Sequence, residues 1–188
     1  MAPNPAHPLD HPVWAALGTQ HRGFALGEGV ARRYPVQVAP FAAMATHAPA
    51  SFQALARLLV PGETVALVLA EDVTPPATFE ILLTKVIDQM VRQVPPAPRG
   101  EPGAEGPAAS GLVVLGPEDV TAMMALVELT KPGPFLPRTH ELGTYLGVRE
   151  GDRLAAMAGE RMRLDGLPSS APCAPIRTTG AGGTPGPS

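Results

Sequence analysis

The sequence predicts an α/β chain built from two unequal segments, and three observations support this fold class. Short apolar runs at 64–70 and 112–115 are bounded by turn residues, which is typical of buried strands. Apolar residues recur at helical spacing over 120–127. Residues 93–111, in contrast, contain almost no large apolar side chain and many Pro and Gly residues, so they are expected to link rather than to fold.

These patterns divide the chain into four parts. We expect a smaller amino-terminal α/β region at 1–92, a Pro/Gly-rich linker at 93–111, a second folded segment at 112–165 and a tail at 166–188. Pro, Gly, Ser, Thr and Ala dominate the tail, so we expect it to be disordered.

Composition excludes several function classes. A net charge of -3 offers no basic surface for nucleic acid or for an anionic membrane. No apolar run approaches the roughly 18 residues that a membrane helix needs, and the start of the chain lacks a secretory signal, so we expect a cytoplasmic protein. The single cysteine, Cys173, excludes an internal disulfide and a Cys-rich metal site, and we assign it no role. His7 and His11 have helical metal-ligand spacing, but Pro8 and Pro12 disfavour a helix there, so no metal site is predicted.

The amino-terminal region predicts helix, extended chain, helix and strand in that order. Val13, Trp14, Leu17 and His21 recur at helical spacing. An extended piece broken by prolines follows, and then a second helix that Ser51 could cap and that a Pro-Gly pair would stop. The run at 64–70 reads as a buried strand. Residues 79–91 fit a strand or a helix, and we prefer the strand.

The second segment begins with a short strand, "GLVVLG" at 111–116. Pro117 suits the first position of a helix, and Glu118 and Asp119 place negative charge at its N-terminus. The apolar stripe of this helix comprises Val120, Met123, Met124 and Val127, and the sequence "TKPGPF" at 130–135 is expected to stop the helix. A short helical turn, a strand at 143–149, a turn at 150–152 and a longer strand at 153–164 complete the segment.

Short sequence motifs in both segments resemble those of one protein family. "PGPF", "RTHELGTYLG" and "DRLAAMAGERM" occur in the order found in the first half of Gcn5-related N-acetyltransferase (GNAT) domains of the FR47-like group. "HPVW", "ARRYP", "PFAAM" and "PGETVAL" resemble the amino-terminal half of the same proteins. The resemblance implies a partial GNAT-like mixed sheet with flanking helices.

The resemblance also implies transfer of an acetyl group from acetyl-CoA to a primary amine, carried by a small molecule or a peptide. In such proteins the cofactor's pyrophosphate lies on a Gly-rich turn after the fourth strand, at a helix N-terminus. Arg177, Gly180 and Gly182 match that turn literally. We expect the prolines before them to prevent the strand that should precede it.

A one-base shift of reading frame would let GC-rich codons of the tail encode the expected strand and turn. We therefore expect the tail to be an out-of-frame translation and the truncated acetyltransferase to have little or no activity. The alternative is a non-catalytic binding or interaction module that keeps the front half of the fold. In either case an open sheet edge and exposed apolar surface would favour self-association.

The resemblance points to a small set of site residues. Glu160 could present a carboxylate to the amine, although a solvated strand carboxylate is the simpler interpretation. The acceptor site is bordered in the related fold by the positions of Phe135, Arg138, Thr139 and Glu141, which could equally cap a helical turn or pack locally. We expect Tyr145 to be a packing residue.

Overall fold

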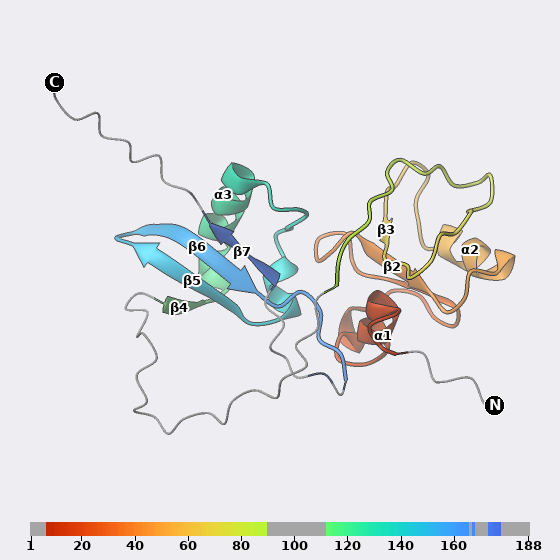
Figure 1. Cartoon of the computed structure of the whole chain (residues 1–188), viewed down its shortest axis with the longest axis horizontal. Coiled ribbons are helices and arrows are strands. Elements are labelled where there is room, and N and C mark those ends of the chain that lie inside the picture. The colour runs from red at the N-terminus through yellow and green to blue at the C-terminus, as the bar shows by residue number, and fades with distance from the viewer. Residues whose placement is uncertain (1–6, 90–111, 166, 168–172, 178–188) are drawn as a thin grey trace.

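The computed structural model describes residues 7–89, 112–165, 167 and 173–177, the last five through their backbone. It contains two sheets, with strand orders β1-β2-β3 and β4-β5-β6-β7, and helices against each of them (Figure 1). The α/β class predicted from the sequence is confirmed. The predicted linker at 93–111 lies outside the described residues, and the four-part division of the chain stays a prediction.

The first sheet is small and packs against two helices. Its elements are α1 (Pro12–Gly18), η1 (Arg22–Phe24), β1 (Ala31–Arg33), β2 (Phe41–Met44), α2 (Pro49–Ala56) and β3 (Ala66–Leu67). β2 pairs antiparallel with β1 and parallel with β3. Val13 and Leu17 of α1 pack with Tyr34 and Val38, while Phe52 and Leu55 of α2 pack on the strands. The helical and extended order predicted for this region is therefore confirmed.

Three expectations for this region were wrong in detail. Ser51 does not cap α2, because the helix begins two residues earlier at Pro49 and buries Ser51, whose hydroxyl lies 3.1 Å from Thr46 Oγ1. The strand expected at 64–70 shrinks to two partly exposed residues. Residues 79–89 form neither strand nor helix, and Leu83 and Val86 are 81% and 89% exposed. An apolar run without a packed partner gains nothing from regular structure.

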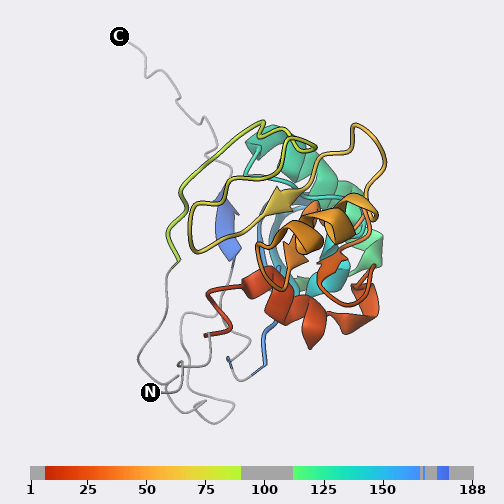
Figure 2. The ribbon, with the colours of Figure 1, turned by 90° about the vertical axis from the view of Figure 1, so that its right-hand side faces the viewer.

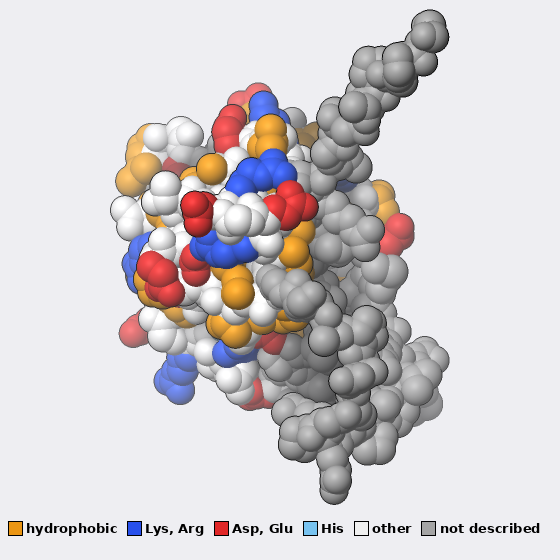
Figure 3. All heavy atoms as spheres, turned by 90° about the vertical axis from the view of Figure 1, so that its left-hand side faces the viewer, with side chains coloured by type: hydrophobic (Ala, Val, Ile, Leu, Met, Phe, Trp, Pro, Cys, Tyr) orange, Lys and Arg blue, Asp and Glu red, His pale blue; other side chains and the backbone are white. Residues whose placement is uncertain are grey.

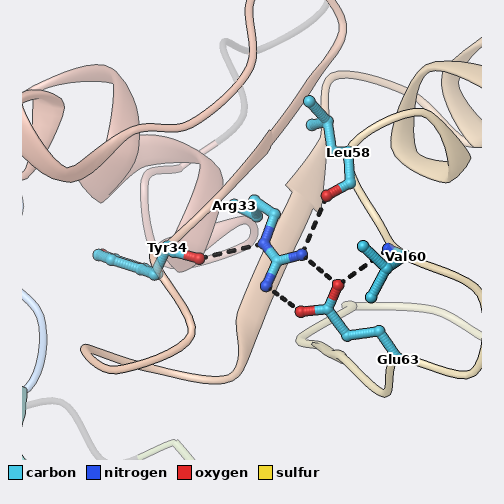
Figure 4. A network of polar contacts seen from close by, with 5 residues as sticks. All are labelled: Arg33, Tyr34, Leu58, Val60 and Glu63. Carbon is cyan, nitrogen blue, oxygen red and sulfur yellow. Dashed lines mark hydrogen bonds and ion pairs between the residues drawn. The ribbon is translucent and has the colours of Figure 1, made fainter.

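A partly buried ion pair joins β1 to the turn after α2. Arg33 Nη1 donates to Glu63 Oε2 at 2.7 Å and to the Leu58 carbonyl at 3.0 Å, and Nη2 donates to Glu63 Oε1 (Figure 4). Arg33 Nε reaches the Tyr34 carbonyl at 3.2 Å, and the Val60 N–H donates to Glu63 Oε2. The Arg33 guanidinium beside Glu63 lowers the pKa of that carboxyl to about 2.

The second sheet is antiparallel throughout. Its elements are β4 (Leu112–Leu115), η2 (Pro117–Asp119), α3 (Val120–Thr130), η3 (Thr139–Leu142), β5 (Tyr145–Glu150), β6 (Arg153–Gly159) and β7 (Cys173–Arg177). Met123 and Leu126 of α3 pack on Leu115, Leu154 and Met157 of the sheet. Successive side chains of a strand point to opposite faces, so the other face carries exposed apolar residues, namely Leu112, Val114, Leu146 and Val148. Figure 3 views the molecule from the left-hand side of Figure 1 and shows hydrophobic side chains interspersed with charged ones there.

Both ends of α3 follow the sequence prediction. Pro117 opens the helical turn that leads into α3, and the Gly116 N–H donates to Asp119 Oδ2 at 2.9 Å. Lys131 adopts a left-handed conformation with φ of 44° and is followed by Pro132, which cannot continue a helix. The Glu150–Asp152 turn is also confirmed, with Gly151 at a φ of 61°.

The end of the second segment differs from expectation in two ways. β6 stops at Gly159 instead of reaching residue 164. A fourth strand, β7, forms inside the predicted disordered tail and pairs antiparallel with β6. Pro175 was expected to prevent a strand, but β7 is the edge strand of the sheet, and an edge strand tolerates a residue without an N–H.

The two segments share a core and direct hydrogen bonds. Leu142 packs with Val13, Leu17 and Tyr34 of the amino-terminal region. The Arg138 N–H donates to the Gln37 carbonyl at 3.0 Å, and Gln20 Nε2 donates to Asp165 Oδ1 at 2.6 Å. Figure 2 shows the amino-terminal half in front of the second segment. The start of β5 is therefore positioned by both segments.

Candidate functional site

Glu160 lies where β6 ends beside the start of β5. Its N–H donates to the Thr144 carbonyl at 3.1 Å, and the Thr144 N–H donates back to Glu160 Oε2 at 3.0 Å. A Cβ on Gly143 would lie 2.5 Å from the Glu160 Cβ, so this close approach requires glycine. The Glu160 carboxylate is thus held against the backbone at the point where the two strands separate.

Arg163 neutralises this carboxylate. Its Nε and Nη2 donate to Glu160 Oε2 at 3.0 and 2.6 Å, and Nη2 also donates to Thr144 Oγ1 at 3.0 Å. The Glu160 side chain is 14% exposed. A carboxylate that accepts several charge-assisted hydrogen bonds is a poor proton acceptor until those donors move away. Sequence reasoning missed Arg163 and Thr144. Arg163 lies three residues after Glu160, and this spacing could have indicated their ion pair. No local pattern in the sequence indicates the contact with Thr144.

The four predicted acceptor-site residues come together next to this position, in the loop before β5. Phe135 is buried and makes an edge-on contact with Tyr145, their ring centroids 5.6 Å apart. Tyr145 is therefore a packing residue, as predicted. Arg138 Nε and Nη2 donate to Glu141 Oε1 and Oε2 at 2.7 and 2.8 Å. That ion pair raises the pKa of Arg138 and lowers the pKa of Glu141.

Thr139 binds the two segments together rather than facing solvent. Its buried hydroxyl donates to the Val38 carbonyl at 2.7 Å and accepts the Leu136 N–H at 2.8 Å. Each of the four side chains therefore has an intramolecular partner. Their contact with an acceptor amine stays a prediction.

A buried pair, His21 and Tyr34, contacts the same segment through the Leu142 carbonyl. His21 Nδ1 lies 2.7 Å from the Tyr34 hydroxyl, and Nε2 lies 3.0 Å from the Leu142 carbonyl. A neutral imidazole satisfies both contacts, donating to the carbonyl and accepting from the hydroxyl. Burial lowers the pKa of His21 and raises that of Tyr34. Sequence reasoning treated His21 as a helix-face residue, because its partner Leu142 is 121 positions away.

The predicted cofactor turn is only partly within the described residues. Arg177 is the last residue of β7, whereas Gly180 and Gly182 lie outside the described residues. The Gly-rich match therefore directly follows the fourth strand of the sheet, which is the context that the sequence alone argued against. The described part of the chain contains no group of three or more His, Cys, Asp or Glu residues that could hold a metal ion.

Comparison with known proteins identifies the family. No protein-family model matches the chain, and no curated protein matches it. The crystal structure of a GNAT-family protein from Novosphingobium aromaticivorans DSM 12444, described there as a candidate acetyltransferase, is similar with a TM-score of 0.64. The two are 39% identical, and the match covers 84% of this chain and 66% of that one. This chain thus spans slightly less than two thirds of the length of its structural relative.

Among the described residues, every helix is too short or too polar to span a membrane. The α/β fold of this chain is similar to that of the relative over most of its length. Both the sequence resemblance and the structural match therefore lead to one assignment. The chain belongs to the Gcn5-related N-acetyltransferase family.

Proposed function

We propose that this protein transfers an acetyl group from acetyl-CoA to a primary amine of a small molecule or a peptide. The observation that carries the proposal is the structural match to a GNAT-family protein at 39% identity. The geometry is compatible with it, because β7 ends at Arg177, the first residue of the sequence Arg177-Thr-Thr-Gly180-Ala-Gly182. Backbone N–H groups of such a turn would hold the pyrophosphate.

In this proposal acetyl-CoA supplies the activated acetyl group, and the protein holds the amine and the thioester next to each other. The loop over 135–144 borders the amine and is anchored to the amino-terminal region through Thr139 and Leu142. Orientation of two reactants in one site converts their encounter into an effectively unimolecular step. The Glu160 carboxylate can accept the ammonium proton only after Arg163 moves away from it. We therefore assign Glu160 a positioning role, which is to hold the Thr144 backbone.

Titration with acetyl-CoA by calorimetry, followed by measurement of CoA thiol release with a panel of primary amines, tests the proposal. Amine-dependent thiol release above spontaneous hydrolysis supports acetyl transfer. Stoichiometric binding without release against the whole panel contradicts it. A chain that neither binds nor releases also contradicts it, and agrees with the sequence-based prediction that the working turn has been lost from this reading frame.

A Gly180→Val variant provides the control for the turn, because a β-branched side chain would block close approach of an anion to the backbone. Loss of binding in Gly180→Val but not in Gly23→Val places the cofactor at 177–182. Gly23 is suitable for this comparison because nothing lies within 4 Å of a Cβ added there.

The second candidate function is a non-catalytic interaction module, and one surface favours it. Leu112, Val114, Leu146 and Val148 expose between 36% and 71% of their surface on the sheet face opposite α3. Contiguous exposed apolar residues commonly mark association surfaces. Sedimentation velocity over a hundredfold range of concentration tests self-association through this face, with Val114→Glu as the disrupting variant. Concentration-independent monomers would contradict this alternative in its self-associating form.

A further inference from the structure

A cavity in the amino-terminal region lies apart from the candidate site described above. It lies between the end of α1, the loop after η1 and strand β1, and its volume is about 460 Å³. Its polar lining consists of Gly18, Arg22, Gly27, Glu28, Gly29 and Arg32. Cavities of about 300–1,000 Å³ are the usual size of small-molecule sites. The whole lining comes from residues 17–32, so the cavity is a feature of the amino-terminal region alone.

Arg32 is held in this cavity by an aromatic ring. Its guanidinium carbon lies 4.3 Å from the centroid of the Trp14 ring, in cation–π geometry. A Cβ on Gly18 would approach Arg32 Nη1 to 3.0 Å, so the glycine leaves room for the guanidinium in this position. The ring fixes the orientation of Arg32 while leaving its N–H donors available.

The two arginines of the cavity differ from the five described arginines that pair with a carboxylate. Arg33, Arg138, Arg149, Arg153 and Arg163 each pair with a carboxylate. Within the described part of the chain, the guanidinium groups of Arg22 and Arg32 make no hydrogen bond and no ion pair. Two unpaired arginines that line one cavity, Arg22 exposed and Arg32 half-buried, create an electrostatic preference for an anion, and their planar donor geometry suits carboxylate and phosphate oxygens.

The loop that forms the rim is built from glycines in conformations that other residues avoid. Gly27 has a φ of 92°, and a Cβ there would lie 2.5 Å from Leu58 Cδ1. Gly29 has a φ of 68°. Between them, Glu28 places one carboxylate at the rim, which partly offsets the positive charge. The net balance of two cations and one anion favours a ligand with a single oxyanion group.

We propose that this cavity binds a small molecule through one carboxylate or phosphate group, with Arg22 and Arg32 donating to its oxygens. The proposal is independent of acetyl transfer, because it uses no residue after β1. It predicts that Glu28 weakens binding by repulsion and that Trp14 senses the ligand through Arg32.

Trp14 is the only tryptophan of the chain, so its fluorescence reports on this cavity without labelling. Inorganic phosphate and sodium acetate are titrated separately against the full chain, with sodium chloride at matched ionic strength as the reference. We expect saturable emission changes with at least one of the two anions and only a weak, linear change with chloride. The relative affinities for phosphate and acetate then identify which oxyanion the cavity prefers.

Variants separate a specific site from general charge attraction. Arg22→Gln and Arg32→Gln should each weaken binding at least fivefold, and Glu28→Gln should tighten it severalfold. Arg57→Gln removes the same charge from an exposed position outside the cavity and should leave the affinity unchanged. Because Arg32 contacts Trp14, calorimetry measures the affinity of Arg32→Gln independently of emission. Equal weakening by Arg57→Gln, or a linear response of the wild type to both anions, would overturn the proposal.

Discussion

The buried pair of Arg33 and Glu63 provides the most quantitative test of how the amino-terminal region is held together. The Arg33 side chain is 8% exposed and the Glu63 side chain 17%, and their contacts join β1 to the turn after α2 (Figure 4). Replacing Glu63 with Gln keeps an acceptor for the Val60 N–H but leaves the guanidinium without its counter-charge. Removing one partner of a buried pair destabilises a protein by about 3–5 kcal/mol.

Because Glu63 retains some solvent contact, we expect the lower end of that range, about 3 kcal/mol at pH 7. In a chain of 188 residues this corresponds to a lower melting temperature by about 6–12 °C. Urea denaturation followed by circular dichroism measures the free energy of unfolding. Glu141→Gln is the matched control, because it breaks the bidentate pair with Arg138 at an exposed position and should have a much smaller effect.

The effect should depend on pH with a definite sign. The pKa of Glu63 is lowered from 4.5 to about 2, so the unfolded chain takes up the proton first as pH falls. The stabilisation is complete above about pH 5 and decreases towards pH 2, so the gap between wild type and Glu63→Gln should shrink by about half by pH 3. A gap that is constant from pH 7 to pH 3, or a Glu63→Gln effect no larger than that of Glu141→Gln, would refute this reasoning.

Three further predictions concern the junction of the segments and the second sheet. Gly159→Ala should destabilise the protein by about 1–3 kcal/mol in urea denaturation, because its Cβ would lie 2.1 Å from Tyr145 Cδ1, whereas Gly23→Ala should be neutral. Thr139→Val should lower the free energy of unfolding by about 1–3 kcal/mol, because it leaves the Val38 carbonyl without its hydrogen bond. Thr139→Ser keeps the hydroxyl and should retain most of the wild-type stability. Burial lowers the pKa of His21 from 6.5, so stability should fall as pH decreases below that value, and a His21→Gln variant should lose this dependence.

Local patterns predicted the second segment better than the first. Pro117, the acidic first turn and the stop at Lys131-Pro132 define α3 from neighbouring residues alone, and the turn at Gly151 defines the hairpin of β5 and β6. The same reasoning failed at Ser51, where Pro49 opened the helix earlier. It failed at 79–89 because an apolar run indicates burial only if a partner surface covers it.

The sequence predicted which residues belong to the candidate site, but it did not predict most of their contacts. Arg138 and Glu141 lie three residues apart, so their pairing could be read from the sequence. The contacts of Thr139 with Val38 and of His21 with Leu142 join positions more than 100 residues apart, and no local pattern encodes them. Pro175 was interpreted from strand propensity without knowing that its strand would lie at an edge, where a missing N–H is tolerated.

The contacts at the junction imply that the amino-terminal region takes part in whatever the second segment does. Leu142 receives a hydrogen bond from His21 through its carbonyl and packs its side chain among Val13, Leu17 and Tyr34. Two residues later, Thr144 meets Glu160 and Arg163. We therefore expect a change in packing around His21 to reach the backbone beside Glu160. Since the core residue Leu142 would be exposed in residues 112–165 alone, the second segment depends on the first segment for both its stability and its geometry.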